Sequence, residues 1–427
     1  MNTNILNIKL FQALTFTLVI MLAASSLNSH SQNLDTYYKK SSVRLEEVPG
    51  FAAKTNWESL FPDAEKVEYG KNTGLLKEIV VAKDGSIFMC HKTLYEIWKF
   101  DRNGNLLKKF GSKGNKPGQF LSHFSIYGLL DGKYLFTSDN QGRMLFFDTE
   151  GRFIKKLQLT YMPLEMVPLK DSKIAILGFV VGKNAKDIVA IKDFNTGQEK
   201  IIWSQARENL DKSSIVVKIP NEGMISLSLP YSHNSFTSPR LAVSKSGTLL
   251  VGIPENGSIA EYSTSGAKLK SYTLKITPLP ITDEDIQSNY ESFIKRESEF
   301  ETRINNNPRL NQAEKKETIE QFKSQLPKIK DRSLYPVHLP YFSSLIIDSD
   351  GNILVFEFTR DAGSNEFKAY AYDNSGKEIG SSSFVSDSYD LSFIPSSFSF
   401  NNGYVYALAM KKKNEKMPLR LVKFKLL

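Results

Sequence analysis

A pair of glycines spaced 19 residues apart recurs along this 427-residue chain, and the spacing strongly limits what the chain can fold into. The pairs are Gly85 and Gly104, Gly132 and Gly151, and Gly247 and Gly266. An apolar run follows each first glycine, and a run that ends in an aromatic residue precedes each second one. Asp-Gly and Asn-Gly pairs supply the positive φ that tight hairpin turns need. The spacing therefore predicts a series of similar β-hairpins.

Three hairpin-linked strands and a fourth after the second glycine make a unit of about 40 to 50 residues, the size of a β-propeller blade. Six such units centre on residues 79–110, 126–159, 166–203, 240–274, 343–384 and 395–427. The third has Asp171-Ser172-Lys173 in place of its first glycine turn. The predicted fold is all-β, a six-bladed β-propeller. We expect a strand ahead of the first blade, such as Lys66–Tyr69, to pair with the last blade and close the ring.

The segment 278–332, between the fourth and fifth units, has helical periodicity. Thr282 and Asp285 form a capping pattern ahead of a first helix. Asn306-Asn307-Pro308 ends this helix, and a second helix begins at Asn311. The simplest interpretation is a helical hairpin that packs its apolar stripe on a neighbouring blade. An ordered insertion of this length is also typical of a lid or a binding element.

The first 31 residues have the order of a signal peptide, with a polar start, the apolar run Leu10–Ala24 and small polar residues up to Ser31. The apolar run has 15 residues, fewer than the roughly 20 that a membrane-spanning helix needs. We therefore predict that residues 1–31 are removed and that residues 32–427 are exported, either to the periplasm or outside the cell. The single cysteine, Cys90, lies far from the cleavage site, so we expect no lipid anchor or other membrane anchor in the mature chain.

The formal net charge of +9 raises the question of an acidic partner. The densest basic cluster, Lys411–Lys416, lies between two strand-like runs, where a solvated hairpin tip is the ordinary interpretation. The helical segment does not account for the excess of positive charge, because Asp283–Arg332 contains 11 acidic and 10 basic residues. We predict that the protein does not bind nucleic acid.

The stretch Phe110–Phe120 closely resembles the inter-blade signature of NHL-repeat propellers, and Ser138–Asp148 resembles the rest of that repeat. The chain departs from the repeat at His123, near where a proline is usual, and lacks one residue between Asp139 and Arg143. As a whole, the chain resembles six-bladed propeller proteins that are abundant in Bacteroidetes-type bacteria, many of them without an assigned activity. The resemblance implies the fold and says little about function, because one fold carries many functions.

Functional sites of propellers usually form at one mouth of the central channel, from the loops after each second strand and the starts of the innermost strands. Here these positions make a polar funnel of mixed charge. The candidate ligand-binding residues are His91, His123, Asp139, Asn140, Arg240, Glu255, His338, Tyr341, Glu357 and Arg360. Taken singly, each has the ordinary interpretation of an exposed loop side chain. The predicted turn formers of the opposite face are Asp84, Asp101, Asp131, Asp148, Asp350 and Asp373.

Metal-dependent catalysis is an alternative that the sequence leaves open. A calcium cage like that of propeller lactonases and arylesterases needs oxygen ligands from several blades, and several candidates are able to supply them. A zinc lyase on an NHL-like propeller needs converging histidines, and His123 and His338 fall at comparable blade-start positions. No Gly-x-Ser-x-Gly elbow, phosphate loop, Cys-x-x-Cys pair or His-Glu-x-x-His helix is present.

The first hypothesis for function is an exported, non-catalytic binding module that recognises a protein, peptide or glycan at the channel mouth. We expect the helical insertion to cover part of this mouth, beside His123, Asp139, Arg240, Glu357 and Arg360. This hypothesis predicts a monomer without a cofactor or catalytic residues. The second hypothesis is a hydrolase or lyase with calcium or zinc at the same mouth. The third is a structural spacer in an envelope assembly.

Overall fold

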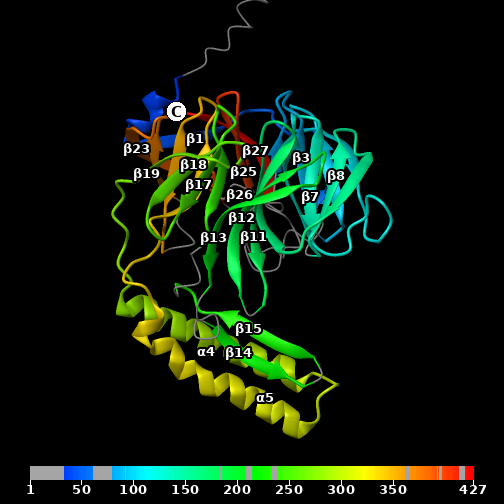
Figure 1. Cartoon of the computed structure of the whole chain (residues 1–427), viewed down its shortest axis with the longest axis vertical. Coiled ribbons are helices and arrows are strands. Elements are labelled where there is room, and N and C mark those ends of the chain that lie inside the picture. Colours follow the sequence, from blue (N-terminus) through cyan, green and yellow to red (C-terminus); the bar gives the residue numbers. More distant parts are fainter. Residues whose placement is uncertain are drawn as a thin grey trace, which may run out of the picture. The chain divides into compact units, whose positions relative to one another are not determined.

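Four-stranded antiparallel sheets follow one another along the chain, each with its strands in sequence order (Figure 1). The computed structural model describes residues 33–60, 79–91, 93–139, 141–182, 184–207, 214–220, 222–231, 238–360, 366–391, 393, 397–412 and 419–427. The first sheet contains β2 (Ile79–Val81), β3 (Ile87–His91), β4 (Glu96–Phe100) and β5 (Leu106–Phe110). The second contains β6 (Phe124–Leu130), β7 (Tyr134–Asp139), β8 (Arg143–Asp148) and β9 (Phe153–Gln158). The third contains β10 (Met162–Pro168), β11 (Lys173–Val180), β12 (Lys186–Asp193) and β13 (Glu199–Ala206), and the fourth contains β16 (Arg240–Val243), β17 (Leu249–Ile253), β18 (Ser258–Tyr262) and β19 (Lys268–Thr273).

Two further sets of strands join in one nine-stranded sheet. The first set is β20 (Phe342–Ile347), β21 (Ile353–Glu357), β22 (Glu366–Tyr372) and β23 (Glu378–Val385), and the second is β24 (Tyr389–Asp390), β25 (Phe398–Asn401), β26 (Tyr404–Lys411) and β27 (Leu419–Leu426). The early strand β1 (Ser42–Glu47) connects them, because it pairs in parallel with β23 and antiparallel with β27. A strand ahead of the first sheet therefore pairs with the last set of strands, and this strand is β1. Lys66–Tyr69 itself lies outside the described residues.

The first strands of the successive sheets lie beside one another in series. β2 lies beside both β25 and β6, β6 lies beside β10, β10 beside β16, and β16 beside β20. Repeated four-stranded antiparallel sheets that meet through their first strands are the arrangement of a β-propeller. The structure is mostly β with few helices, and it is consistent with the predicted propeller class.

Glycine and aspartate form the turns within these sheets, as the repeated spacing predicts. Gly85 has a φ of +86°, and a Cβ at this position would lie 2.8 Å from the Cβ of Arg102. Only glycine meets both requirements. In the next turn, the Asp101 carboxylate accepts hydrogen bonds from the backbone N–H groups of Asn103 and Asn105, each at 2.8 Å. In this turn, the positive φ is supplied by Gly104, and the Asp101 carboxylate holds the backbone in place.

One turn departs from this pattern. In the third sheet, Asp171 and Ser172 adopt φ values of +60° and +54°, which residues other than glycine rarely do. The Asp131 carboxylate accepts hydrogen bonds from the Ser172 N–H at 3.3 Å and hydroxyl at 2.5 Å, so the neighbouring sheet supports this turn. Asp350 lies in the predicted turn, directly before Gly351. The carboxylate that bonds the backbone of this turn belongs to Asp348, whose Oδ1 accepts the N–H of Asp350 at 2.8 Å.

Apolar clusters fill the spaces between neighbouring sheets. Phe88 of the first sheet packs with Leu135 and Phe147 of the second, and similar clusters join the second sheet to the third and the third to the fourth. Burial of each such side chain stabilises the fold by about 1.5 to 3 kcal/mol. Cys90 belongs to the first of these clusters and is buried, so its prediction as a core residue is confirmed.

Two helices lie between β19 and β20, at the positions that the capping patterns predict. They are α4 (Asp283–Asn305) and α5 (Gln312–Gln325), followed by the short 3-10 helices η2 (Leu326–Lys330) and η3 (Arg332–Leu334). Each helix begins with a capping box, at Thr282 and Asn311 respectively. Their phenylalanines stack on one another, with Phe300 and Phe322 at a centroid distance of 4.7 Å.

The interpretation that these helices pack on a blade is wrong. Their apolar stripe packs against a hairpin of two strands, β14 (Ser214–Ile219) and β15 (Gly223–Ser228). In the sequence, this hairpin lies between β13 and β16. The reason is that Ile215, Val217 and Ile219 alternate along β14 and present one continuous apolar face to the helices. We call β14, β15, α4, α5 and η2 the α/β module.

Side chains of α5 protect the edge of β14 that β15 does not cover. The Gln325 side-chain amide accepts a hydrogen bond from the Val216 N–H at 3.0 Å and donates one to the Val216 carbonyl at 2.6 Å. The Gln321 side chain accepts from the Lys218 N–H at 3.1 Å. These amides take the place of a third strand and satisfy the backbone groups of β14. The module therefore has its own apolar core and its own hydrogen-bond network.

Residues Asp35–Leu427 form one compact unit, and of the preceding unit, Met1–Leu34, only the last two residues are described. The predicted signal peptide, residues 1–31, lies outside the described part of the chain. Among the described residues, no helix has both the length and the apolar character that crossing a membrane requires.

Candidate functional site

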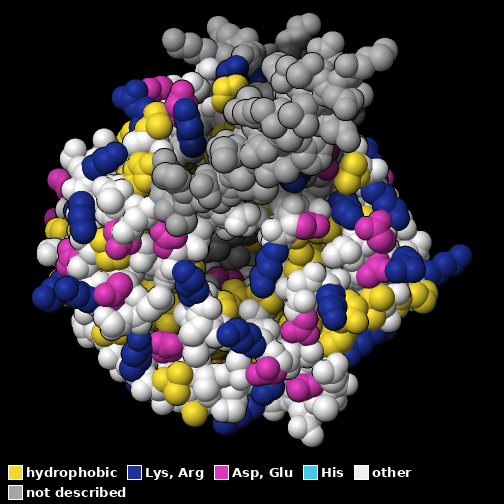
Figure 2. Space-filling view, turned by 90° about the horizontal axis from the view of Figure 1, so that it is seen from above, with side chains coloured by type: hydrophobic (Ala, Val, Ile, Leu, Met, Phe, Trp, Pro, Cys, Tyr) yellow, Lys and Arg dark blue, Asp and Glu magenta, His cyan; other side chains and the backbone are white. Residues whose placement is uncertain are grey.

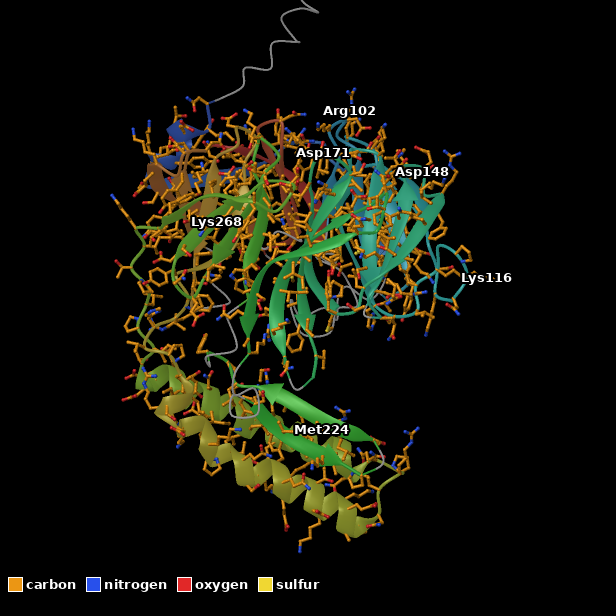
Figure 3. All side chains as sticks on the ribbon, in the orientation of Figure 1. Arg102, Lys116, Asp148, Asp171, Met224 and Lys268 are labelled. Carbon is orange, nitrogen blue, oxygen red and sulfur yellow. The ribbon has the colours of Figure 1, made fainter. Side chains whose placement is uncertain are left out.

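The strand directions divide the loops between two ends of the sheets. The turn end carries the loops after the first and third strands, and Arg102, Asp148 and Asp171 lie there (Figure 3). The connection end carries the loops after the second strands and the connections between sheets, including Lys116 (Figure 3). Nine of the ten candidate residues are described, and all nine lie at the connection end. The tenth, Asn140, lies outside the described residues.

Charges of both signs are mixed on the turn end, which Figure 2 views from above. Lys and Arg side chains alternate there with Asp and Glu side chains and do not gather in one patch. Ion pairs such as Lys99 with Glu150 at 2.7 Å and Arg152 with Asp148 at 2.6 Å bring the two signs together. The described part of this face lacks the basic stripe that is typical of nucleic-acid binding.

The two candidate histidines of the first sheets make local contacts. The His91 Nδ1 accepts a hydrogen bond from the Leu94 N–H at 3.2 Å, and its ring lies 5.1 Å from the ring of Trp98. Burial lowers the pKa of the His91 imidazole, which favours the neutral ring. His123 is exposed and its ring stacks on Tyr95 at 6.1 Å. His91 is therefore part of the sheet, and His123 is accessible.

Asp139 is 1% exposed and organises the loop between β7 and β8. Its Oδ2 accepts hydrogen bonds from Arg143 Nε at 2.8 Å and Nη2 at 2.5 Å. Its Oδ1 accepts from the backbone N–H groups of Gln141 and Arg143 at 3.1 and 3.2 Å. Both carboxylate oxygens are thus bonded within the loop, which gives Asp139 a structural role.

Glu165 of β10 and Arg240 of β16 lie on adjacent first strands. The Glu165 Oε1 accepts a hydrogen bond from the Leu241 N–H at 3.3 Å. Loss of water around the half-buried carboxyl raises its pKa to about 7, against the lowering effects of Arg240 and this N–H. Arg240 Nε donates to the carbonyl of Ser343 on β20 at 2.8 Å. This polar group therefore joins the first strands of three sheets. Sequence analysis found Arg240 but missed Glu165, although it is the one charged residue of β10.

A second polar group ties down both ends of the segment that carries β14 and β15. Arg207 follows β13, and its Nε lies 3.0 Å from each carboxylate oxygen of the buried Asp187. Arg207 Nη2 donates to the Ser238 hydroxyl at 2.8 Å, and this hydroxyl donates to Asp187 at 3.2 Å. Sequence reasoning missed this group, because its members are separated by 20 to 51 residues and no local spacing marks them.

The segment that carries the helices has a paired root of its own. The Leu339 N–H donates to the Leu279 carbonyl at 2.8 Å, and the Ile281 N–H donates to the Val337 carbonyl at 3.1 Å. His338 lies on this root, and its ring meets the ring of Tyr341 edge-on at 5.2 Å. The structure therefore brings two predicted site residues together where the module joins β19 and β20.

Arg360 links the fifth set of strands to the start of α4. Its Nε lies 2.9 Å from Asp285 Oδ1, and its Nη2 donates to the Pro280 carbonyl. The other two acidic candidates have separate partners. Glu357 forms an ion pair with Lys368 at 3.5 Å, and the exposed Glu255 accepts a hydrogen bond from Gln205 at 3.1 Å. The candidates thus form small local groups and not one converging cluster.

Metal ligands do not converge in the part of the chain that the structure describes. No three or more His, Cys, Asp or Glu side chains are grouped there in a way that could hold a metal ion.

Large apolar side chains are exposed at the connection end. Val337 of the module root is 79% exposed, and Val181 of the β11–β12 loop is 73% exposed. The others at this end are Leu94, Leu121, Met162 and Leu164, and Met224 on β15 of the module is 67% exposed (Figure 3). Near the turn end, Tyr404 and Leu427 are exposed, and so are four residues close to the start of outer strands, Leu107, Ile154, Ile201 and Leu269, the most exposed of them at 58%.

No family model matches the sequence, and no curated protein matches it significantly. Solved structures with some similarity include a DUF4221 family member from Bacteroides vulgatus, with 12% identity, 91% of this chain and 99% of that chain covered, and a TM-score of 0.49. A presumed exported protein from Bacteroides fragilis has 13% identity, coverage of 83% and 92%, and a TM-score of 0.45. Virginiamycin B lyase from Staphylococcus aureus has 8% identity, coverage of 82% and 80%, and a TM-score of 0.37. These TM-scores are below 0.5, so the case for the fold rests on the sheets of this chain.

Proposed function

We propose that the mature chain is an exported six-bladed β-propeller with NHL-like repeats. The blades are β2–β5, β6–β9, β10–β13, β16–β19, β20–β23, and β25–β27 with β1 as the outer strand. The agreement between the glycine spacing and the sheet boundaries supports this count, as does the series of adjacent first strands. On this assignment, β14–β15 and α4–α5 are insertions on either side of the fourth blade.

We further propose that this propeller binds a protein or peptide partner, without catalysis, at the connection end. The observation that carries the proposal is the exposure of apolar side chains there, led by Val181 and Val337. Apolar surface left in water costs about 25 cal/mol per Å² relative to burial, and strongly exposed apolar side chains are typical of interaction surfaces. Near the turn end, the most exposed large apolar side chain among the described residues is Leu107 at 58%, well below the 79% of Val337 and the 73% of Val181.

The α/β module supports the same assignment. Two long connections leave the connection end and meet to build one module with its own core. Polar contacts fix both roots, through Asp187 in one and through the Arg360–Asp285 ion pair at the other. Long connections at one end of a rigid scaffold are typical of binding elements. The module therefore adds surface to the face that exposes the apolar residues.

The proposal is tested with peptides selected from a displayed random library against the mature protein. We expect the selected peptides to lose at least tenfold in affinity for a Val181→Asp, Val337→Asp double variant, because aspartate keeps water on the apolar surface. A Tyr404→Asp variant at the turn end is the matched control and retains wild-type affinity. Equal affinity for all three proteins, or failure of the library to give any binder, would contradict the proposal.

Export is tested by N-terminal sequencing of the protein recovered from the medium or periplasm. We expect the mature chain to begin close to Gln32, because the apolar run and the small polar residues that follow are the features that signal peptidases recognise. Recovered material that still begins with Met1 would refute the proposal.

The absence of a cofactor, another part of the proposal, is tested by thermal unfolding of the mature protein after EDTA treatment and after addition of calcium or zinc. A metal that binds only the folded state raises the unfolding temperature by mass action. We expect no metal-dependent shift, and a clear rise would favour the metal-dependent enzyme instead.

A further inference from the structure

A groove of about 290 Å³ lies between the third and fourth sheets. Its wall on one side is Trp203 of β13, and the rest of the lining comes from β17, β18, β19 and the loop between β17 and β18. This volume is near the lower limit of about 300 Å³ for small-molecule pockets, so the groove suits a ligand of one ring. It is separate from the apolar residues of the connection end, and the inference from it does not rest on the proposed function.

A β-bulge gives Trp203 its position. Val189 pairs with Trp203 and Ala190 pairs with Ile201, which leaves Ile202 as an extra residue in β13. Bulges re-aim the side chains around them, and here both Ile202 and Trp203 pack toward the fourth sheet. Trp203 is half-buried, and no described residue accepts a hydrogen bond from its indole N–H. The wall thus offers an aromatic surface and one hydrogen-bond donor.

Polar groups surround an apolar floor. The floor consists of Val251, Ile253 and Ala260. Hydroxyls of Ser258, Ser271 and Thr273 and the amide of Asn256 line the groove. The Ser258 hydroxyl donates to Asn256 Oδ1 at 2.6 Å, and the side-chain amide N–H groups of Asn256 have no partner among the described residues. Lys268, at one end, is the only charged residue among the described residues of the lining (Figure 3).

Hydrogen bonds connect the third and fourth sheets on both sides of the groove. Near the turn end, Lys200 Nζ donates to the Ser265 carbonyl at 2.9 Å. Near the connection end, Gln205 Nε2 donates to Glu255 Oε2 at 3.1 Å. Trp203 lies between these two cross-sheet contacts in the sequence of β13. Contacts that join the two walls before a ligand arrives reduce the entropy lost on binding.

We propose that this groove binds one pyranose ring of a neutral glycan. The C–H face of a pyranose is apolar and slightly positive, so it packs well on the electron-rich face of Trp203. The hydroxyls of the ring are both donors and acceptors, and they match the serine and threonine hydroxyls and the Asn256 amide. No carboxylate of the described residues lines the groove, so it has no partner for a basic peptide, and one lysine at its end is too few for a polyanion.

Tryptophan fluorescence reports directly on this groove. The chain has three tryptophans, and Trp57 and Trp98 are 8% and 0% exposed, so a ligand in the groove contacts Trp203 alone. The mature protein is first applied to an array of neutral glycans. The methyl glycoside of the terminal sugar of each bound glycan is then titrated while fluorescence is recorded. We expect a saturable change in emission for at least one methyl glycoside.

Variants assign the binding to the groove. We expect Trp203→Ala to weaken glycan binding at least tenfold and Ser271→Ala with Thr273→Ala to weaken it severalfold. Ile154→Ala on β9, which is exposed on an outer strand of another sheet, retains wild-type affinity. Trp203→Phe keeps an aromatic wall and retains part of the affinity, which separates loss of the ring from loss of the fold. Thermal unfolding of each variant confirms that it is folded.

Three results would overturn the inference. They are an array on which no neutral glycan binds, glycan binding that survives in folded Trp203→Ala, and quenching of Trp203 by a library peptide but by no glycan. The peptide selection at the connection end is unaffected by Trp203→Ala, so failure of this inference and failure of the proposed function are distinguishable.

Discussion

Replacing Glu165 with glutamine tests whether the carboxyl on β10 carries a proton that depends on the fold. Burial raises its pKa from 4.5 to about 7, so the folded protein keeps this proton at pH values where the unfolded chain has lost it. The stability that this group contributes is therefore complete below about pH 4.5 and is lost as the pH rises through about 7. In the Glu165→Gln variant, the side-chain amide oxygen can still accept the hydrogen bond from the Leu241 N–H at every pH.

The magnitude follows from the shift. At about 1.4 kcal/mol per unit of pKa, a change from 4.5 to about 7 corresponds to about 3 kcal/mol. Glu165 is only half-buried by its exposed area, although protein atoms surround it closely enough for desolvation to dominate its pKa. Water that reaches the carboxyl lowers the effect, and we expect about 1 to 2 kcal/mol.

Urea unfolding at a series of pH values measures this effect as the difference in the free energy of unfolding between Glu165→Gln and the wild type. We expect little difference at pH 4 and a variant that is about 1 to 2 kcal/mol more stable at pH 8. Glu255→Gln is the control, because it removes an exposed carboxylate from the β17–β18 loop. It shows how the loss of one surface charge changes the free energy of unfolding between pH 4 and pH 8. A difference for Glu165→Gln that is the same at pH 4 and pH 8 would refute the reasoning.

Three further substitutions test the closure of the sheets, the β7–β8 loop and the root of the module. Leu45→Ala on β1 removes a side chain that is 3% exposed and should lower the free energy of unfolding by about 2 to 5 kcal/mol in urea; a loss near zero means that β1 does not close the fold. Asp139→Ala removes the partner of the buried Arg143, and we expect the free energy of unfolding to fall by about 3 to 5 kcal/mol. An unchanged free energy of unfolding would contradict the structural role of Asp139. Arg360→Ala should speed amide exchange in the first turn of α4 but not in the sheets, and unchanged exchange there means that the pair with Asp285 does not hold the helix.

The strands and turns of the sheets were predictable from the sequence, because they depend on local requirements of the backbone. Positive φ at Gly85 and carboxylate bonds from Asp101 act within a few residues, so their spacing gave the strands without knowledge of any partner. The capping boxes at Thr282 and Asn311 marked the two helices for the same reason. Asp348 shows the limit of this kind of argument, because two aspartates lie in the same turn and only the geometry distinguishes them.

The candidate site was less predictable. Sequence position was enough to place His338, Tyr341 and Arg360 at the connection end, but not to say what each side chain contacts. The fully bonded state of Asp139 depends on how its loop folds back over the carboxylate. The environment of Glu165 depends on the neighbouring strand β16, where the N–H of Leu241, 76 residues away in the sequence, donates to the carboxylate. Burial and bonding partners of this kind are properties of the assembled sheets.

The sequence by itself determined the repeating strands, the turns between them and the starts of the two long helices, because each depends on neighbours along the chain. The tertiary structure decided which distant segments meet. β1 pairs with β27 at the far end of the chain, and β14 pairs with side chains of α5 that are more than 100 residues away. Such partners are selected by complementary apolar faces and unpaired backbone groups, which many segments of this chain possess. In the assembled sheets and module, one set of pairings buries these apolar faces and satisfies these backbone groups at the same time.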